Sequence, residues 1–303
     1  MPQANFPDFL IIGAGKAGTT SLYYYLQQHP NICMSPIKET NFFAYTPDGA
    51  DQFLNLDSSL FPVKDIATYK KLFTSGNPNT VQGESSPIYL WHPAAPENIH
   101  KHIPGTKLIC VLRNPVERAY SAYFMYVSQN FERRSFLQAI ADELKTRKSG
   151  NWPLGRGVYI GLGFYFQQLK RYLHYFNDKQ IKIILYDDYC RNIYETLNRI
   201  YRFLEIPENI FPKTLIRHNT SGMPKNRIIH YLLQPRTFTN QIRRHMPRYI
   251  HDPVFDFFMK IKSRNLLKCP MDSNIRLLLI EIFYEDILQL QQLINKDLSQ
   301  WLK

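Results

Sequence analysis

An α/β protein with a parallel sheet between two layers of helices is the architecture that three features of this sequence predict. Short, continuous apolar runs alternate with helical patterns along most of the chain. A glycine-rich loop follows the first apolar run, and an Arg-Asn-Pro sequence follows a later one. Continuous apolar runs are typical of parallel strands that are buried on both faces, and helices connect such strands.

The composition is that of a globular protein whose partner is anionic. The 303 residues are 44% hydrophobic, and 37 Lys and Arg against 25 Asp and Glu give a net charge of +12. This excess fits a nucleotide, a nucleic acid, a sulfated or phosphorylated substrate, or a membrane surface. The four widely spaced cysteines predict reduced thiols and no zinc site. Without a long apolar run or a leader pattern, a cytoplasmic location and no membrane span are expected.

The elements follow in order from the apolar patterns. The run 9–12 predicts a buried strand that ends at Gly13, and 20–28 predicts a helix that His29-Pro30 stops. The run 107–112 predicts a second strand, and Pro115 suits the first turn of a helix over 116–129. Further on we expect a helix at 164–176, a strand at 181–186 and a helix at 194–204.

No Gly/Ser-rich or Pro-rich linker divides the chain, so one domain over residues 1–303 is expected. Its core would span about 7–206. Residues 209–251 contain many Lys and Arg and no Asp or Glu, and 272–302 has the apolar spacing of a long amphipathic helix.

A phosphate-binding loop is the strongest local motif. It reads Gly13-Ala-Gly-Lys16-Ala-Gly18-Thr19-Thr20-Ser21, between a predicted strand and a helix, where backbone N–H groups can surround an anion. Its Lys precedes the last glycine, unlike the G-x-x-x-x-G-K-[ST] loop that binds a nucleoside triphosphate with magnesium. A merely tight turn is the simpler alternative.

A second anion site is indicated at the end of the second long strand. Arg113 offers a planar fork for a phosphate, and Ser121 on the following helix offers a short donor. The corresponding strand of a P-loop NTPase would carry a metal-binding Asp. Taken alone, an Arg at a helix start is more often a solvated charge.

Glu39 is the candidate general base. It follows Lys38 and precedes the aromatic pair Phe42-Phe43. Burial beside the aromatic rings would raise the pKa of Glu39, whereas Lys38 would lower it. The direction of the net pKa shift therefore stays open. An ion pair on a loop is the simpler alternative.

Together these segments resemble the PAPS-dependent sulfotransferases, which transfer a sulfuryl group from 3′-phosphoadenosine 5′-phosphosulfate (PAPS) to a hydroxyl or amine. The similarity is to the heparan-sulfate-type glycan branch and its unanchored prokaryotic relatives, from Phe9-Leu-Ile-Ile-Gly13 to Asp297-Leu-Ser-Gln-Trp301. It implies that Lys16 stabilises the leaving phosphate, that Arg113 and Ser121 hold the 3′-phosphate, and that Glu39 is the catalytic base. No metal is implied.

The resemblance also implies a set of cofactor contacts. A late basic loop, Ser221 to Arg227, would close over the nucleotide, and Tyr165 is preferred to Tyr159 for the family's G-x-Y element. Gly83-Glu-Ser-Ser-Pro87 matches a segment that faces the substrate, but Ser85 stands where the heparan-type enzymes tend to have Lys, which leaves the sulfate acceptor undetermined. The cofactor contacts expected are Lys16, Ala17, Gly18, Thr19, Thr20, Ser21, Arg113, Ser121, Tyr165, Lys225, Asn226 and Arg227.

Two other functions compete with this interpretation. A P-loop nucleotide kinase would need a metal-binding Asp and a Lys directly before Ser or Thr, and neither stands at the expected place. A protein that binds nucleic acid or an anionic membrane could use Arg243, Arg244 and Arg248 in the basic segment. We expect no nucleic-acid partner, and the oligomeric state stays open.

Overall fold

Five parallel strands form the central sheet of the computed structural model, in the order β2-β3-β1-β4-β5. The structure describes residues 5–45, 60–74, 80–148, 157–215, 223–224, 266–267 and 269–303. The strands are β1 (Phe9–Gly13), β2 (Ile32–Met34), β3 (Val81–Ser85), β4 (Lys107–Leu112) and β5 (Ile181–Leu185). Because all of them run in the same direction, their carboxyl ends meet at one edge of the sheet.

The central strands are buried on both faces, as their continuous apolar sequences require. Every residue of β1 is buried, and Phe9 lies in register with Gly83 of β3 on one side and Lys107 of β4 on the other. A Cβ on Gly83 would lie 2.2 Å from Cζ of Phe9, so only glycine lets the ring cross this position.

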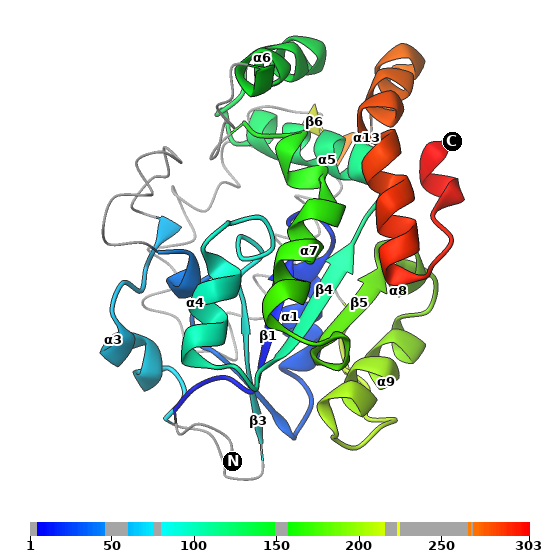
Figure 1. Ribbon diagram of the computed structural model, residues 1–303. Coiled ribbons are helices and arrows are strands. Elements are labelled where there is room, and N and C mark those ends of the chain that lie inside the picture. The colour runs from blue at the N-terminus through cyan, green and yellow to red at the C-terminus, as the bar shows by residue number, and fades with distance from the viewer. Residues whose placement is uncertain are drawn as a thin grey trace.

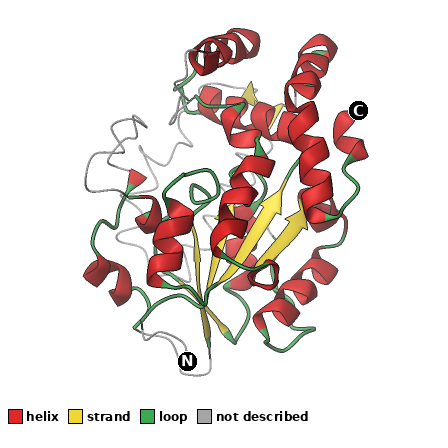
Figure 2. Cartoon of the chain, in the orientation of Figure 1, coloured by secondary structure: helices red, strands yellow, loops and turns green. Residues whose placement is uncertain are grey.

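Helices cover both faces of the sheet (Figures 1 and 2). Their bounds are α1 (Thr19–Leu26), α3 (Ile66–Lys71), α4 (Ala95–His102), α5 (Pro115–Ser128), α6 (Phe136–Lys148), α7 (Tyr165–Tyr175), α8 (Tyr186–Arg191), α9 (Ile193–Leu204) and α13 (Ser273–Ile294). In Figure 1, α4 and α7 lie in front of the strands and α1 lies behind them. The three-layer α/β architecture with a parallel sheet is therefore confirmed.

Short elements complete the described chain. Four 3-10 turns are η1 (Phe42–Ala44), η3 (Gly161–Gly163), η4 (Asp178–Gln180) and η6 (Ser299–Leu302). Two strands outside the main sheet, β6 (Met223–Pro224) and β7 (Leu266–Leu267), pair antiparallel.

The predicted elements agree with the structure to within a few residues, with one larger difference. The long C-terminal helix, predicted over 272–302, ends at Ile294 because Asn295 adopts a left-handed conformation with φ 49° and closes the helix. Strands β2 and β3 were not predicted, because β2 has three residues and β3 contains the polar pair Gln82 and Glu84. Asn114 caps α5 by accepting from the N–H of Val116 at 2.9 Å, ahead of Pro115 at the first helical position.

Helix α13 packs on α7, and a buried carboxylate of α13 holds the N-terminus of α7. Asp286 Oδ2 accepts from the N–H of Phe166 at 3.2 Å. Burial raises the pKa of Asp286 from 3.8 to about 6, although neighbouring N–H groups and Arg147 favour the ionised form.

This carboxyl makes folding stability depend on pH. The folded protein holds the proton of Asp286 up to about pH 6, whereas the unfolded chain releases it near 3.8, so stability falls as the pH rises between these values. The shift corresponds to at most ~3 kcal/mol. We expect Asp286→Asn to flatten the pH dependence of the free energy of unfolding between about pH 4 and 6, measured by urea denaturation. The same slope in both proteins would contradict the assignment.

Candidate functional site

A cavity of about 950 Å³ lies at the carboxyl edge of the sheet, and the segments that follow all five strands contribute to its wall. The lining includes Lys16 after β1, Glu39 after β2, Trp91 after β3, Arg113 after β4 and Tyr186 after β5. Ligands of open parallel α/β sheets bind at this edge. The topology therefore gathers residues that are far apart in the sequence into one site.

The glycine-rich loop forms one wall of the cavity. Gly18 has φ 85°, and a Cβ there would lie 3.0 Å from Cε1 of Tyr189 and 3.1 Å from Cε2 of Tyr186, so only glycine fits this turn. Helix α1 starts directly after it, with no acidic residue in its first turn. The positive end of the helix dipole is thus directed to the loop, as an anion site requires.

Most of the predicted loop contacts lie at the cavity. Gly18, Thr19, Thr20 and Ser21 line it together with Lys16. Ala17 differs from the prediction, because its side chain is fully buried, it is not part of the cavity wall, and its N–H donates to the carbonyl of Ala14 at 3.1 Å. Its role is to close the turn.

Lys16 is held in an unusual backbone conformation by its neighbours. Its φ is 71°, in the left-handed region that non-glycine residues rarely adopt. Its carbonyl accepts from Nη1 of Arg113 at 3.2 Å, and its Nζ lies 3.5 Å from Sδ of Met125 on α5. Strained residues of this kind are concentrated at functional sites.

Arg113 joins the loop to the opposite wall. Its guanidinium lies 4.9 Å from the centre of the Tyr186 ring, and its Nη2 lies 3.9 Å from a carboxylate oxygen of Glu117. Glu117 is also bonded by Arg276 of α13. Ser121, two turns into α5, lines the same cavity and is 8% exposed. Arg113 and Ser121 therefore both line this cavity.

Glu39 lies at the cavity on a tight turn. Its φ is 62° and that of Asn41 is 54°, and the N–H of Glu39 donates to the carbonyl of Ser85 at 3.0 Å. The carboxylate is 51% exposed and is paired with Lys38. The possibility that Glu39 is buried against the aromatic pair is wrong, because the turn directs Phe43 into the core and leaves Glu39 at the cavity.

The comparisons with known proteins agree with this arrangement. The family described as "Sulfotransferase domain" matches residues 6–248, which include the glycine loop, Glu39, Arg113 and Ser121. The chain belongs to the sulfotransferase family.

Several relatives of this sulfotransferase chain carry glycan-related names. It is 28% identical over 224 residues to a bifunctional heparan sulfate N-deacetylase/N-sulfotransferase 1 of Caenorhabditis elegans, covering 72% of this chain and 24% of that protein. It is 26% identical to carbohydrate sulfotransferase 15 of Rattus norvegicus, covering 66% of this chain and 44% of that protein. The chain thus spans less than half the length of these two relatives.

A solved structure resembles the chain over nearly its whole length. The sulfotransferase from Alicyclobacillus acidocaldarius is 27% identical, with a TM-score of 0.72, and the match covers 98% of this chain and 99% of that one. The parallel sheet with its glycine loop is therefore the fold of a solved sulfotransferase.

Tyr165 does not contact the cavity, contrary to the prediction. Its ring is fully buried and is not part of the cavity wall, and its hydroxyl donates to the carbonyl of Arg113 at 3.0 Å. Burial raises the pKa of Tyr165, which keeps this donor protonated. Tyr159, the alternative, is also fully buried and donates to Glu132 at 3.0 Å. Tyr165 is therefore a positioning residue for Arg113.

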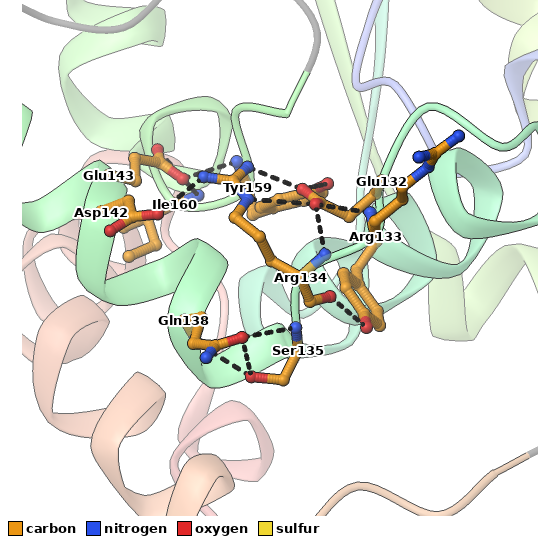
Figure 3. Close-up of polar contacts among 10 residues, drawn as sticks. Glu132, Arg133, Arg134, Ser135, Gln138, Asp142, Glu143, Tyr159 and Ile160 are labelled. Atoms are coloured by element: carbon orange, nitrogen blue, oxygen red, sulfur yellow. Dashed lines mark hydrogen bonds and ion pairs between the residues drawn. The ribbon is translucent and has the colours of Figure 1, made fainter.

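Helix α6 holds the loop that leads into α7 (Figure 3). Glu143 accepts from the N–H groups of Tyr159 at 2.7 Å and Gly161 at 2.6 Å, and burial raises the pKa of Glu143. Close to it, Arg134 bonds Glu132 at 2.7 Å, which lowers the pKa of Glu132 to about 2. These contacts fix the start of α7, where Tyr165 lies.

A buried carboxylate at the end of β3 organises the loop that carries Glu39. Glu84 is fully buried and accepts from the hydroxyls of Thr40 and Tyr69 at 2.8 Å, of Tyr89 at 3.1 and 3.2 Å, and of Ser86. Burial raises the pKa of Glu84. The prediction that this segment faces the substrate is wrong for residues 83–86, which are buried, and only Pro87 of the motif lines the cavity.

The Glu84 network predicts a contrast in stability between two glutamates. In Glu84→Gln an NH₂ group replaces one carboxylate oxygen, so at least one buried hydroxyl loses its hydrogen-bond acceptor. We expect the free energy of unfolding to fall by about 1–3 kcal/mol in urea denaturation. Glu39→Gln, at an exposed carboxylate, is the matched control and should leave stability unchanged. An unchanged midpoint for Glu84→Gln would contradict the assignment.

Of the predicted closing loop, Ser221 to Arg227, the structure describes Met223 and Pro224. Lys225, Asn226 and Arg227 lie outside the described residues. The preceding strand β6 lies next to α5, the helix that carries Ser121. Within the described ranges no helix is long and apolar enough to span a membrane, and no three His, Cys, Asp or Glu side chains gather as a metal site.

Sequence reasoning assigned none of the aromatic residues of the wall to the site, and Trp91 and Tyr186 are two of them. Trp91 and Tyr186 line the cavity, and Tyr186 directly follows β5. A signal for Tyr186 was present in the sequence, because the residue after a buried parallel strand lies at the ligand edge. Trp91 lies six residues beyond β3, which was not predicted.

Proposed function

We propose that this protein transfers a sulfuryl group from PAPS to a hydroxyl or amine of a glycan-type compound. The observation that supports it best is the hydrogen bond from the Arg113 guanidinium to the backbone carbonyl of Lys16, which ties Arg113 to the glycine loop in a cavity that Lys16, Arg113 and Glu39 all line. A nucleotide with phosphates on both the 5′ and the 3′ position needs two such sites. The relatives' names, heparan sulfate and carbohydrate sulfotransferase, suggest the glycan.

The residues divide between binding and chemistry. The glycine loop, Lys16 and the N-terminus of α1 hold the 5′-phosphosulfate, while Arg113 and Ser121 hold the 3′-phosphate. Tyr165 keeps the Arg113 backbone in place. Tyr186 supplies an aromatic surface beside both sites.

The transfer is an in-line displacement at sulfur. The oxygen or nitrogen of the sulfate acceptor attacks sulfur, its proton passes to the Glu39 carboxylate, and the bond from sulfur to the bridging phosphate oxygen breaks. The leaving group is 3′-phosphoadenosine 5′-phosphate (PAP). Lys16 and the loop N–H groups stabilise the charge that develops on its 5′-phosphate.

The arrangement does not favour a nucleotide kinase. Strand β4 is followed by Arg113 where a kinase would need a metal-binding carboxylate, and Arg113 faces the cavity. The closing role of Lys225, Asn226 and Arg227 and the cytoplasmic location stay predictions from the sequence.

Calorimetric titration with PAP, beside AMP and ATP with magnesium, tests the proposal. We expect tight binding of PAP and weak binding of AMP, because only PAP engages Arg113 and Ser121. Preference for ATP with magnesium, or no binding of any nucleotide, would overturn the proposed function.

A further inference from the structure

A carboxylate lies among the residues proposed to hold the 3′-phosphate. Arg113, Glu117 and Ser121 follow one another at intervals of four residues, and all three line the cavity. Glu117 belongs to the first turn of α5 and Ser121 to the next, so the two share one face of the helix. A carboxylate between two groups that hold a phosphate opposes anion binding, so its presence there needs a physical reason.

Two contacts other than Glu117 hold the Arg113 guanidinium. Its Nη1 donates to the carbonyl of Lys16 at 3.2 Å, and its Cζ lies 4.9 Å from the centre of the Tyr186 ring. Nη2 lies 3.9 Å from Oε2 of Glu117, which is beyond hydrogen-bond length. Glu117 therefore acts on Arg113 through its charge and not through a directional bond. A guanidinium has five N–H groups, so a phosphate can bind while the bond to Lys16 persists.

Glu117 is held from its other side by the C-terminal helix. Nη2 of Arg276, in the first turn of α13, donates to Oε1 of Glu117. Helix α13 packs on α5, and Asp272 caps α13 by accepting from the N–H of Asn274 at 2.9 Å. The three charges thus form a chain from Arg113 through Glu117 to Arg276, and of these three Arg276 alone does not line the cavity. Their side chains are 21%, 35% and 33% exposed, so water screens the charges in part.

A contact that is the same for PAPS and for PAP adds nothing to the rate of the chemical step. The 3′-phosphate keeps its structure while the S–O bond on the 5′ side breaks, so Arg113 would bind substrate, transition state and product alike. Stronger binding there lowers the KM for PAPS but also slows the release of PAP. A carboxylate next to Arg113 reduces this uniform binding without contacting the atoms that react.

We propose that Glu117 limits the affinity of the site for the 3′-phosphate and thereby speeds the release of PAP. This inference rests on the proposed function and adds a residue to it. The carboxylate partly neutralises Arg113 and repels the 3′-phosphate. Arg276 offsets part of the charge of Glu117, so α13 sets how strongly the carboxylate acts. Glu117 is thus neither the general base nor a ligand of the nucleotide, but a residue that weakens nucleotide binding.

Glu117→Gln tests the effect of the charge. The amide keeps the size of the side chain and an oxygen that can accept from Arg276, so the charge is the main change. We expect PAP to bind about three- to tenfold more tightly in calorimetry, and the affinity for AMP, which lacks the 3′-phosphate, to change by less than about twofold. The dissociation rate of radiolabelled PAP, measured after addition of excess unlabelled PAP, should fall by a similar factor.

Two further variants separate the charge of Glu117 from the total charge of the protein and from Arg276. Glu281→Gln removes an exposed carboxylate of α13 that does not line the cavity, and it should change the affinity for PAP by less than about twofold. Arg276→Ala should weaken PAP binding by about two- to fourfold, because Glu117 then acts unopposed. Combined with Glu117→Gln, the same replacement should leave PAP affinity nearly unchanged, since Arg276 acts through Glu117.

The outcomes distinguish the two proposals. If the native protein binds PAP but Glu117→Gln binds it equally well or more weakly, Glu117 has only a structural role, and the inference is wrong while the proposed function stands. Equal tightening of PAP and AMP, or an unchanged affinity for PAP in Arg276→Ala, would also contradict the inference. If the native protein does not bind PAP, the proposed function itself is wrong.

Discussion

Glu39→Gln is expected to lose sulfuryl transfer by about 10²- to 10⁴-fold while binding PAP as the native protein does. The amide keeps the size of the side chain but cannot take the proton of the attacking hydroxyl. Binding of PAP should persist because the proposed anion sites contain Lys16 and Arg113 and not Glu39. The measurement is the rate of labelled sulfuryl transfer from PAPS to a panel of neutral and acidic glycosides, with PAP affinity from calorimetry.

The control for Glu39→Gln is Glu97→Gln. Glu97 is exposed on the first turn of α4 and does not line the cavity, so its replacement should change neither rate nor affinity. An unchanged transfer rate in Glu39→Gln would contradict the assignment of Glu39 as the general base. Loss of PAP affinity together with the rate would instead show that the turn at Glu39 supports the donor site.

Arg113→Ala is expected to weaken PAP binding by about 10²- to 10³-fold, because in the proposed function the guanidinium makes charge-assisted hydrogen bonds to the 3′-phosphate. AMP lacks that phosphate and should lose much less. The result that tests the role of Arg113 is therefore the ratio between the loss of affinity for PAP and the loss of affinity for AMP. Both affinities are measured by calorimetry.

Arg276→Ala is the matched control for Arg113→Ala. Arg276 also bonds Glu117, but it does not line the cavity. Its replacement tests whether the effect belongs to the guanidinium at the cavity or to the pairing of Glu117. Equal losses for PAP and AMP in Arg113→Ala would indicate that Arg113 acts by holding the Lys16 carbonyl, since that bond shapes the loop for any nucleotide.

Local sequence patterns predicted the strands and helices that have strong apolar signals. They did not predict strands whose polar residues are buried and hydrogen-bonded by distant segments. Strand β4 reads KLICVL and was predicted correctly. Strand β3 reads VQGES, and its Glu84 is stable in the interior only because hydroxyls from distant segments bond it. No window of sequence contains those partners.

The site shows the same division. Lys16, Arg113, Ser121 and Glu39 were predicted from motifs, and the structure places all four at one cavity. Tyr165 was predicted to contact the cofactor, but its hydroxyl donates a hydrogen bond to the Arg113 carbonyl in the protein interior. Tyr165 is the first residue of α7, and α13 packs against that helix. The side chains of α7 that become buried depend on this packing. The local sequence does not encode the position of α13.

The sequence by itself determined the parallel α/β fold and the glycine loop, and it supplied the residue types of the two proposed anion sites, because these depend on the order of apolar runs and on local backbone requirements. Only the tertiary structure decided that Glu39 is exposed at the cavity, that residues 83–86 are buried, and that Tyr186 lines the same cavity as Glu39. Those properties arise from contacts between segments more than forty residues apart, such as Thr40 with Glu84 and Tyr89 with Tyr172. Burial and hydrogen bonding at that range are set by packing, which a linear pattern does not contain.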